Sequence, residues 1–162
     1  MISTKIFTVP IIILACVVLS IPATQAQTPF DVTECAAGLM TMVYHSKEMA
    51  IYGIEGKGIF ISHHENKVFD NFTFQVVAIG KIEGDKRTSE SYWKIMDPDG
   101  DIIIAEVIVV IPEKTMKFLH GTGKWKGIKG GGKGKGVTAG KPITAGTIQA
   151  CSRYTGTFEL PK

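Results

Sequence analysis

The sequence predicts an all-β domain, folded as an antiparallel sandwich or barrel. From Ala50 onward, short apolar runs alternate with turn residues at a spacing of about 8–12 residues, which is typical of such folds. Helical periodicity is hard to find after residue 46. With 162 residues, of which 44% are apolar, the chain has the length and composition for one packed core and not for two.

Residues 1–26 predict a secretory signal peptide, with the charged Lys5, an apolar run over 11–19 and small residues ending at Ala26. We expect cleavage after Ala26 and export to the periplasm or the extracellular space. The apolar run is too short to span a bilayer, so we expect no integral membrane span in the mature chain. A lipoprotein lipidated at Cys16 is an alternative, disfavoured by the strongly apolar residues that follow.

Cys35 and Cys151 remain once the signal peptide is removed. An exported protein meets an oxidising environment, where an even cysteine count favours a disulfide. The bond would join the N-terminal segment to the last strand. Closing this loop of more than 100 residues would contribute about 4–5 kcal/mol to the free energy of unfolding in the chain-entropy model. The alternative is two separate buried thiols.

The segment 27–49 is expected as a lead-in before the β domain 50–162. It would hold one short helical turn, capped by Asp31 or Thr33, or an irregular strand. Eight strands follow, each with an error of about 2–4 residues at its bounds. They are 50–55, 57–63, 69–82, 87–97, 101–111, 114–121, 133–139 and 146–159.

Two turns set the register of the central strands. Residues 97–101 place proline at the first turn position and glycine where φ is positive, which predicts a three-residue hairpin loop with a glycine bulge. This turn pairs Trp93 with Ala105. A two-residue loop at 112–113 would then pair Ala105 with His120 on the next strand.

Alternation along these three strands separates two faces. The better core face holds Ser91, Trp93, Ile95, Ile103, Ala105, Val107, Val109, Met116, Phe118 and His120. The other face holds Tyr92, Lys94, Met96, Ile102, Ile104, Glu106, Ile108, Val110, Lys117 and Leu119. This second face is too apolar for a solvated surface. Either the sheet is covered on both sides or the second face packs against another subunit, and we favour a homo-oligomer.

Three polar residues on these strands are candidates for chemistry. His120 on the core face would serve as a ligand contact or proton donor, although a histidine on an apolar face is more often a packing residue. Glu106 would act as an acid or base if it were buried. The register instead places Glu106 outward, beside Tyr92, and we favour an exposed or interfacial ion pair.

No metal site and no cofactor are expected. His63 and His64 are adjacent on a strand, so their imidazoles point to opposite faces. The acidic turn 97–101 is similar to the start of a calcium loop but continues directly into a strand. The glycine-rich run 127–133 nearly matches a phosphate-binding loop, but it lacks the following Ser or Thr and the following helix.

Lysines crowd the segment 124–141, and no acid lies between Glu113 and Glu159. Such a patch would attract anionic ligands, or it would be a flexible, solubilising loop, which we favour. Trp125 within it looks exposed and is a candidate for stacking on a ligand. The formal net charge of the chain is +3, too small to predict a nucleic-acid partner.

Residues 118–132 resemble a motif of the allene oxide cyclase-like superfamily of small barrels, in which a strand ending in Gly-Thr-Gly precedes a glycine-rich segment and a closing strand. Residues 146–160 fit the same plan, and the 97–101 hairpin is similar to one in exported bacterial members. The resemblance covers about residues 50–160. It implies that the domain 50–162 is an eight-stranded antiparallel, calycin-like β-barrel with a filled or ligand-holding interior.

Plant members of this superfamily are trimeric cyclases, and dirigent proteins steer the coupling of phenoxy radicals. None of their catalytic residues aligns with a position here, so the resemblance implies no active site. We expect an exported, non-enzymatic barrel that binds a small apolar or amphipathic molecule. The expected ligand contacts are Trp93, Phe118, His120 and Trp125.

Two other functions stay open. One is a cyclase, isomerase or dirigent-type protein that acts on a substrate inside the barrel, with His120, Tyr92 or Glu106 as proton donor or electrostatic stabiliser. The other is a structural or partner-binding surface protein that uses its two apolar faces.

Overall fold

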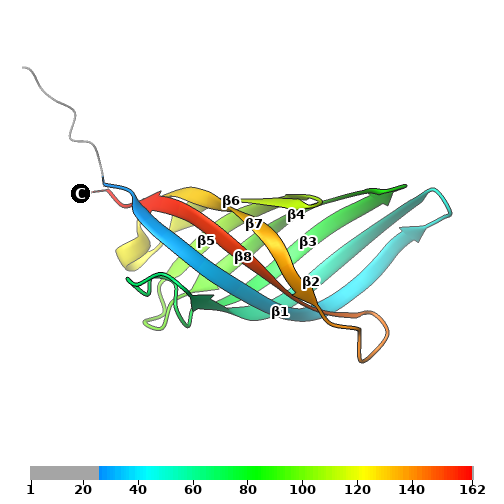
Figure 1. Ribbon diagram of the computed structural model, residues 1–162, viewed down its shortest axis with the longest axis horizontal. Helices are drawn as coiled ribbons and strands as arrows, with labels where there is room; N and C mark the ends of the chain where they lie inside the picture. The colour runs from blue at the N-terminus through cyan, green and yellow to red at the C-terminus, as the bar shows by residue number, and fades with distance from the viewer. Residues whose placement is uncertain (1–25, 162) are drawn as a thin grey trace, which may run out of the picture.

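Eight strands form one closed antiparallel barrel in a computed structural model that describes residues 26–161 (Figure 1). The strands are β1 (Thr28–His45), β2 (Met49–Ser62), β3 (Thr73–Glu83), β4 (Lys86–Met96), β5 (Ile102–Val110), β6 (Glu113–Gly121), β7 (Lys129–Ala139) and β8 (Thr147–Glu159). A short 3-10 helix, η1 (Gly123–Trp125), follows β6. The predicted eight-stranded barrel is therefore confirmed.

The expected signal peptide and Cys16 lie outside the described residues, apart from Ala26. Within residues 26–161, no helix has the length and apolar character needed to cross a bilayer.

The first strand is the main correction to the expected elements. Most of the segment 27–49, expected as a lead-in outside the β domain, forms β1, an 18-residue strand that pairs with both β2 and β8. The barrel therefore begins at Thr28 and not at residue 50. The expected strands 50–55 and 57–63 are a single strand, β2, because Gly56 interrupts the apolar pattern without interrupting the pairing: it lies opposite Gly38 and Val76.

The predicted hairpin at residues 97–101 is confirmed. The backbone N–H of Asp97 donates to the carbonyl of Asp101 over 2.9 Å, and Gly100 has the positive φ that this turn requires, at 93°. Trp93 lies opposite Ala105 as expected.

The β5–β6 register differs from the prediction by two residues. Val110 pairs with Glu113, so the loop is at 111–112, and Ala105 lies opposite Phe118 instead of His120. An even shift leaves each side chain on its predicted face, so Phe118 is buried as expected. Beyond Phe118 the pairing is irregular, and His120 lies exposed, opposite Ile104. The placement of His120 on the core face was therefore wrong.

The described chain begins and ends at the same end of the barrel (Figure 1). Aromatic side chains of the core fill this end. The loop 63–72 between β2 and β3 inserts Phe69 into this core. Its ring centroid lies between 5.2 and 5.7 Å from those of Phe30, Phe72, Phe118, Trp125 and Phe158. We call Phe69 and these five partners the aromatic plug. A cavity among Phe30, Phe69 and Phe118 measures only about 10 Å³, so this end has no room for a ligand.

Candidate functional site inside the barrel

Four polar side chains meet inside the barrel, next to the aromatic core. Glu34 comes from β1, Lys114 from β6, and Ser152 and Tyr154 from β8. Glu34, Ser152 and Tyr154 are buried, with at most 4% of each residue exposed, whereas the Lys114 side chain is 21% exposed. We call these four residues the interior polar cluster.

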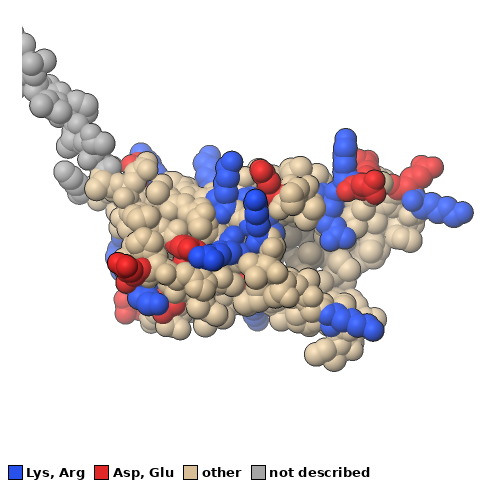
Figure 2. Space-filling view, in the orientation of Figure 1, with Lys and Arg blue, Asp and Glu red and all other residues tan. Residues whose placement is uncertain are grey.

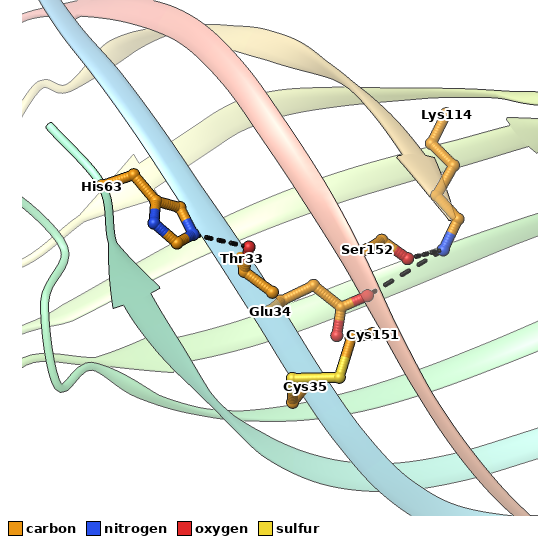
Figure 3. Close-up of a disulfide and its surroundings, with 7 residues drawn as sticks. All are labelled: Thr33, Glu34, Cys35, His63, Lys114, Cys151 and Ser152. Atoms are coloured by element: carbon orange, nitrogen blue, oxygen red, sulfur yellow. Dashed lines mark hydrogen bonds and ion pairs between the residues drawn. A yellow bond between two sulfur atoms is a disulfide. The ribbon is translucent and has the colours of Figure 1, made fainter. Parts of the chain in front are cut away.

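Glycines on β7 allow Lys114 to reach the cluster. Gly134 lies between Lys114 and Tyr154 in the sheet, and a Cβ atom at Gly134 would overlap the ring of Tyr154. Because β7 presents no side chain there, Lys114 Nζ reaches past it and donates a hydrogen bond to Ser152 Oγ over 2.5 Å. The same nitrogen lies 3.9 Å from Glu34 Oε1, and Figure 3 shows the three side chains converging.

Burial dominates the electrostatics of the cluster. It raises the pKa of Glu34 to about 7, against the opposing effects of Lys114 and Ser152. Burial likewise lowers the pKa of Lys114, while the nearby Glu34 acts in the other direction. Burial, and then the charge of Glu34, raise the pKa of Tyr154. Glu34 therefore divides between its acid and carboxylate forms near neutral pH.

Two atoms of the cluster have unused hydrogen-bonding capacity. Glu34 Oε2 and the Tyr154 hydroxyl are buried and have no hydrogen-bond partner among residues 26–161. Buried polar atoms are nearly always paired, because leaving one unpaired costs about 1–3 kcal/mol. The cluster is therefore equipped to receive a polar group from a ligand.

The barrel is open on the side of the cluster away from the aromatic plug. Gly136 on β7 pairs with Ser152 and so shares its inner face. A Cβ atom at Gly136 would meet nothing within 4 Å, so free space lies beside Ser152. The next inward positions on β1 and β8 are Ala36 and Ala150, which are small and partly exposed. We call this space the open half of the barrel.

The predicted disulfide is present. Cys35 and Cys151 are bonded across β1 and β8, with their Cα atoms 4.1 Å apart and a sequence separation of 116. They lie directly beside Glu34 and Ser152, which face each other in the same strand pair (Figure 3). The bond therefore crosses the seam where the first and last strands close the barrel, at the level of the interior polar cluster.

The other residues singled out from the sequence lie elsewhere. Tyr92 and Glu106 are paired on the outer face, as expected for Glu106, and Tyr92 is 50% exposed. The Tyr92 hydroxyl donates to Glu90 over 2.8 Å and contacts Glu106 at 3.3 Å, and these two acids raise its pKa to about 12. Neither candidate reaches the interior, and His120 does not either.

Three aromatic residues expected to contact a ligand are packed into the core. Trp93 stacks on Phe74 and meets the Tyr154 ring edge-on, so it lies beside the interior polar cluster. Phe118 belongs to the aromatic plug. Trp125 is buried and not exposed, because η1 turns it inward and its indole N–H donates to Asp97 over 2.8 Å.

The lysine-rich segment is largely strand β7, not a flexible loop. Figure 2 shows its basic side chains on the face that carries β7, with acidic side chains among them. Arg153 forms an ion pair with Asp31 at 2.6 Å, and Lys124 bridges Asp97 and Asp99. The fold therefore partly neutralises a patch that looked free of acids in the sequence. No group of three or more His, Cys, Asp or Glu side chains within residues 26–161 is placed to hold a metal ion.

The interior polar cluster was not predicted from the sequence, although a signal for part of it was present. Lys114 lies two and four residues before Met116 and Phe118, which were assigned to the core face, so alternation along the strand places it on that same face. Glu34 continues the inward alternation of Phe30 and Val32. What the local pattern did not reveal is that these positions meet, because that depends on the closure of β1 against β8.

Comparisons with known proteins concern the fold. No protein-family model and no curated protein matches the sequence. Among solved structures, the pterocarpan synthase dirigent protein GePTS1 aligns with a TM-score of 0.54 over 85% of this chain and 93% of that one, at 12% identity. The pterocarpan synthase dirigent protein PsPTS1 aligns with a TM-score of 0.50 over 82% and 96%, also at 12% identity.

The chain has the barrel fold of the dirigent proteins. This finding confirms the resemblance inferred from residues 118–132 at the level of the fold. In this dirigent-type barrel, as in any fold, function has to be argued from the site itself.

Proposed function

We propose that this protein binds a small apolar or amphipathic molecule in the open half of the barrel, with a polar group of the ligand on the interior polar cluster. One observation carries the proposal: Glu34 Oε2 and the Tyr154 hydroxyl are buried with no hydrogen-bond partner in the described part of the chain, and free space lies nearby at Gly136. Ligand sites combine a mostly apolar concave surface with a few convergent polar groups, which is the arrangement found here.

Export supports this function, since the carrier would meet its ligand outside the cytosol. The charged start, apolar run and small residues of 1–26 are the basis for a cleaved signal peptide. The Cys35–Cys151 disulfide is compatible with an oxidising compartment.

A homo-oligomer is also part of the proposal. The outer face of β3, β4 and β5 carries large exposed apolar side chains, which a monomer in water rarely gathers on one face. They include Val77, Ile79, Tyr92, Met96, Ile108 and Val110, each between 43% and 60% exposed. A second copy of the chain would bury this face and leave the interior accessible.

A second candidate function, catalysis of a proton-transfer or coupling reaction inside the barrel, is favoured by Glu34. A carboxyl group with a pKa of about 7 is suited to give and take protons at neutral pH. The solved dirigent structures that share the fold are described as pterocarpan synthases. Binding in the open half is common to both functions, so it is the property to test first.

Titration with the fluorescent apolar amine N-phenyl-1-naphthylamine tests the proposal. Gly136→Phe places a ring in the open half where a Cβ meets no atom, so it should fill the site without disturbing the fold. We expect it to weaken dye binding about tenfold or more, equivalent to about 1.4 kcal/mol.

The matched control is Val77→Ser with Ile79→Ser, which makes the outer face of β3 polar and leaves the interior intact. We expect this variant to bind the dye as the wild type does. If the control loses binding and Gly136→Phe keeps it, the dye binds outside and the proposal is wrong.

A further inference from the structure

We propose that Lys114 forms a Schiff base with an aldehyde or ketone that enters the open half of the barrel. The inference rests on the proposed function and deepens it by naming the reactive group of the ligand. It is carried by the position of the amine, by the groups that surround it and by the free space beside it.

Lys114 is set apart from every other lysine within residues 26–161 by its position. It is the one lysine there that is largely shielded from solvent, and its amine is held inside the barrel against Ser152. The side chain is nevertheless 21% exposed, so the amine is not sealed off. Because Gly134 and Gly136 leave the neighbouring strand bare, a small molecule in the open half would approach Nζ without first displacing a side chain of β7.

Imine formation requires an uncharged amine, and the surroundings of Lys114 favour that form. Burial lowers its pKa, and each unit of lowering gives about ten times more neutral amine at a given pH. Desolvation of this kind is a general means of making a lysine nucleophilic. The hydrogen bond to Ser152 Oγ also fixes the orientation of the amine.

Glu34 supplies the acid that the reaction needs. Lys114 Nζ attacks the carbonyl carbon, the C–N bond forms, and the carbonyl oxygen takes up the proton that the nitrogen loses. Glu34 in its acid form then protonates the resulting hydroxyl, which leaves as water. The remaining proton on nitrogen returns to the Glu34 carboxylate as the C=N bond forms. Amine and carbonyl thus give imine and water, with no change of oxidation state.

The position of Glu34 suits this role. Glu34 Oε1 lies 3.9 Å from Lys114 Nζ, and Oε2 has no partner among residues 26–161, so it is free to face a ligand. With a pKa of about 7, Glu34 offers both its acid and its base form at neutral pH.

Reductive trapping tests the inference on the full mature protein. Butyraldehyde and sodium cyanoborohydride at pH 7 convert an imine to a stable butyl-lysine, which peptide mass spectrometry locates. Lys117, exposed on the outer face of the same strand, is the internal control. We expect Lys114 to be alkylated about ten times faster than Lys117. Equal or slower alkylation of Lys114 overturns the proposal.

Two variants separate the possible causes. Glu34→Gln should slow alkylation at Lys114 and leave Lys117 unchanged, because it removes the acid and keeps a side chain of the same shape. Gly136→Phe should block Lys114 alone. If Gly136→Phe abolishes dye binding but Lys114 of the wild type does not react, the Schiff base is wrong and the proposed binding function stands. If Gly136→Phe leaves dye binding intact, the proposed function itself fails.

Discussion

Glu34 occupies a position where an apolar side chain would pack at lower cost in free energy. The residues before it on the inner face of β1 are Phe30 and Val32, both buried in the core. Lys114 compensates the carboxylate only in part, since 3.9 Å is too long for a hydrogen bond. A buried acid and a partly buried amine, with shifted pKa values and side by side inside the barrel, favour a functional site over a structural ion pair.

The stability of the protein should therefore depend on the ionisation of Glu34. Its pKa is raised from an ordinary value of 4.5 to about 7, so the folded protein retains a proton that the unfolded chain releases in this range. The free energy of unfolding should fall by up to about 3 kcal/mol as the pH rises from about 4.5 to 7. Urea unfolding at several pH values measures this slope.

Glu34→Gln is the matched variant for that experiment, because it cannot ionise. The difference in unfolding free energy between wild type and variant should change across pH 4.5 to 7 and level off above it. A constant difference over the whole range would show that Glu34 titrates as an ordinary exposed acid.

The strands differ in how well the sequence predicted them. The strands β3 to β6 and β8 follow alternating apolar residues and clear turns, so they were located to within a few residues. β7 consists mostly of glycine and lysine, and its start was predicted four residues too late. β1 was expected only as one of two alternatives, an irregular lead-in strand outside the barrel, because its inward positions include Glu34 and Gly38, which break the apolar alternation. Residues with a role in a site or in close backbone packing weaken the pattern that identifies a strand.

The seam between β1 and β8 depends on its disulfide. Replacing Cys35 and Cys151 together with Ala should lower the free energy of unfolding by about 2–5 kcal/mol, because the bond closes a loop of 116 positions. Chemical denaturation with and without a reducing agent measures the effect. The reductant should destabilise the wild type and leave the double variant unchanged. Equal stability of wild type and variant in the absence of reductant would contradict the prediction.

At the scale of the whole molecule, the barrel is divided into a filled part and an open part. The aromatic plug packs one end, while glycine and alanine leave space beside the interior polar cluster. The superfamily resemblance predicted the barrel, but not this division. It arises because Glu34, Lys114 and Ser152 are brought together by barrel closure, and local periodicity carries no information about contacts between the two ends of a chain.

The outer face leads to a prediction about assembly. Ile79 and Ile108 line one apolar groove on the surface. If copies of the chain associate through it, sedimentation velocity should show an oligomer, and replacing both residues with Glu should give a monomer. Ile143→Glu is the control, since Ile143 is 92% exposed on the β7–β8 loop. A wild type that sediments as a monomer at micromolar concentration would contradict this prediction.

The proposed binding site is the open half of the barrel, beside Glu34. A crystal structure of the protein with N-phenyl-1-naphthylamine tests it most directly. We expect the dye inside the barrel, with its rings beside Gly136 and its N–H within hydrogen-bonding distance of Glu34 Oε2. Dye bound only to the outer face, with the interior filled by the protein's own side chains, would contradict the claim.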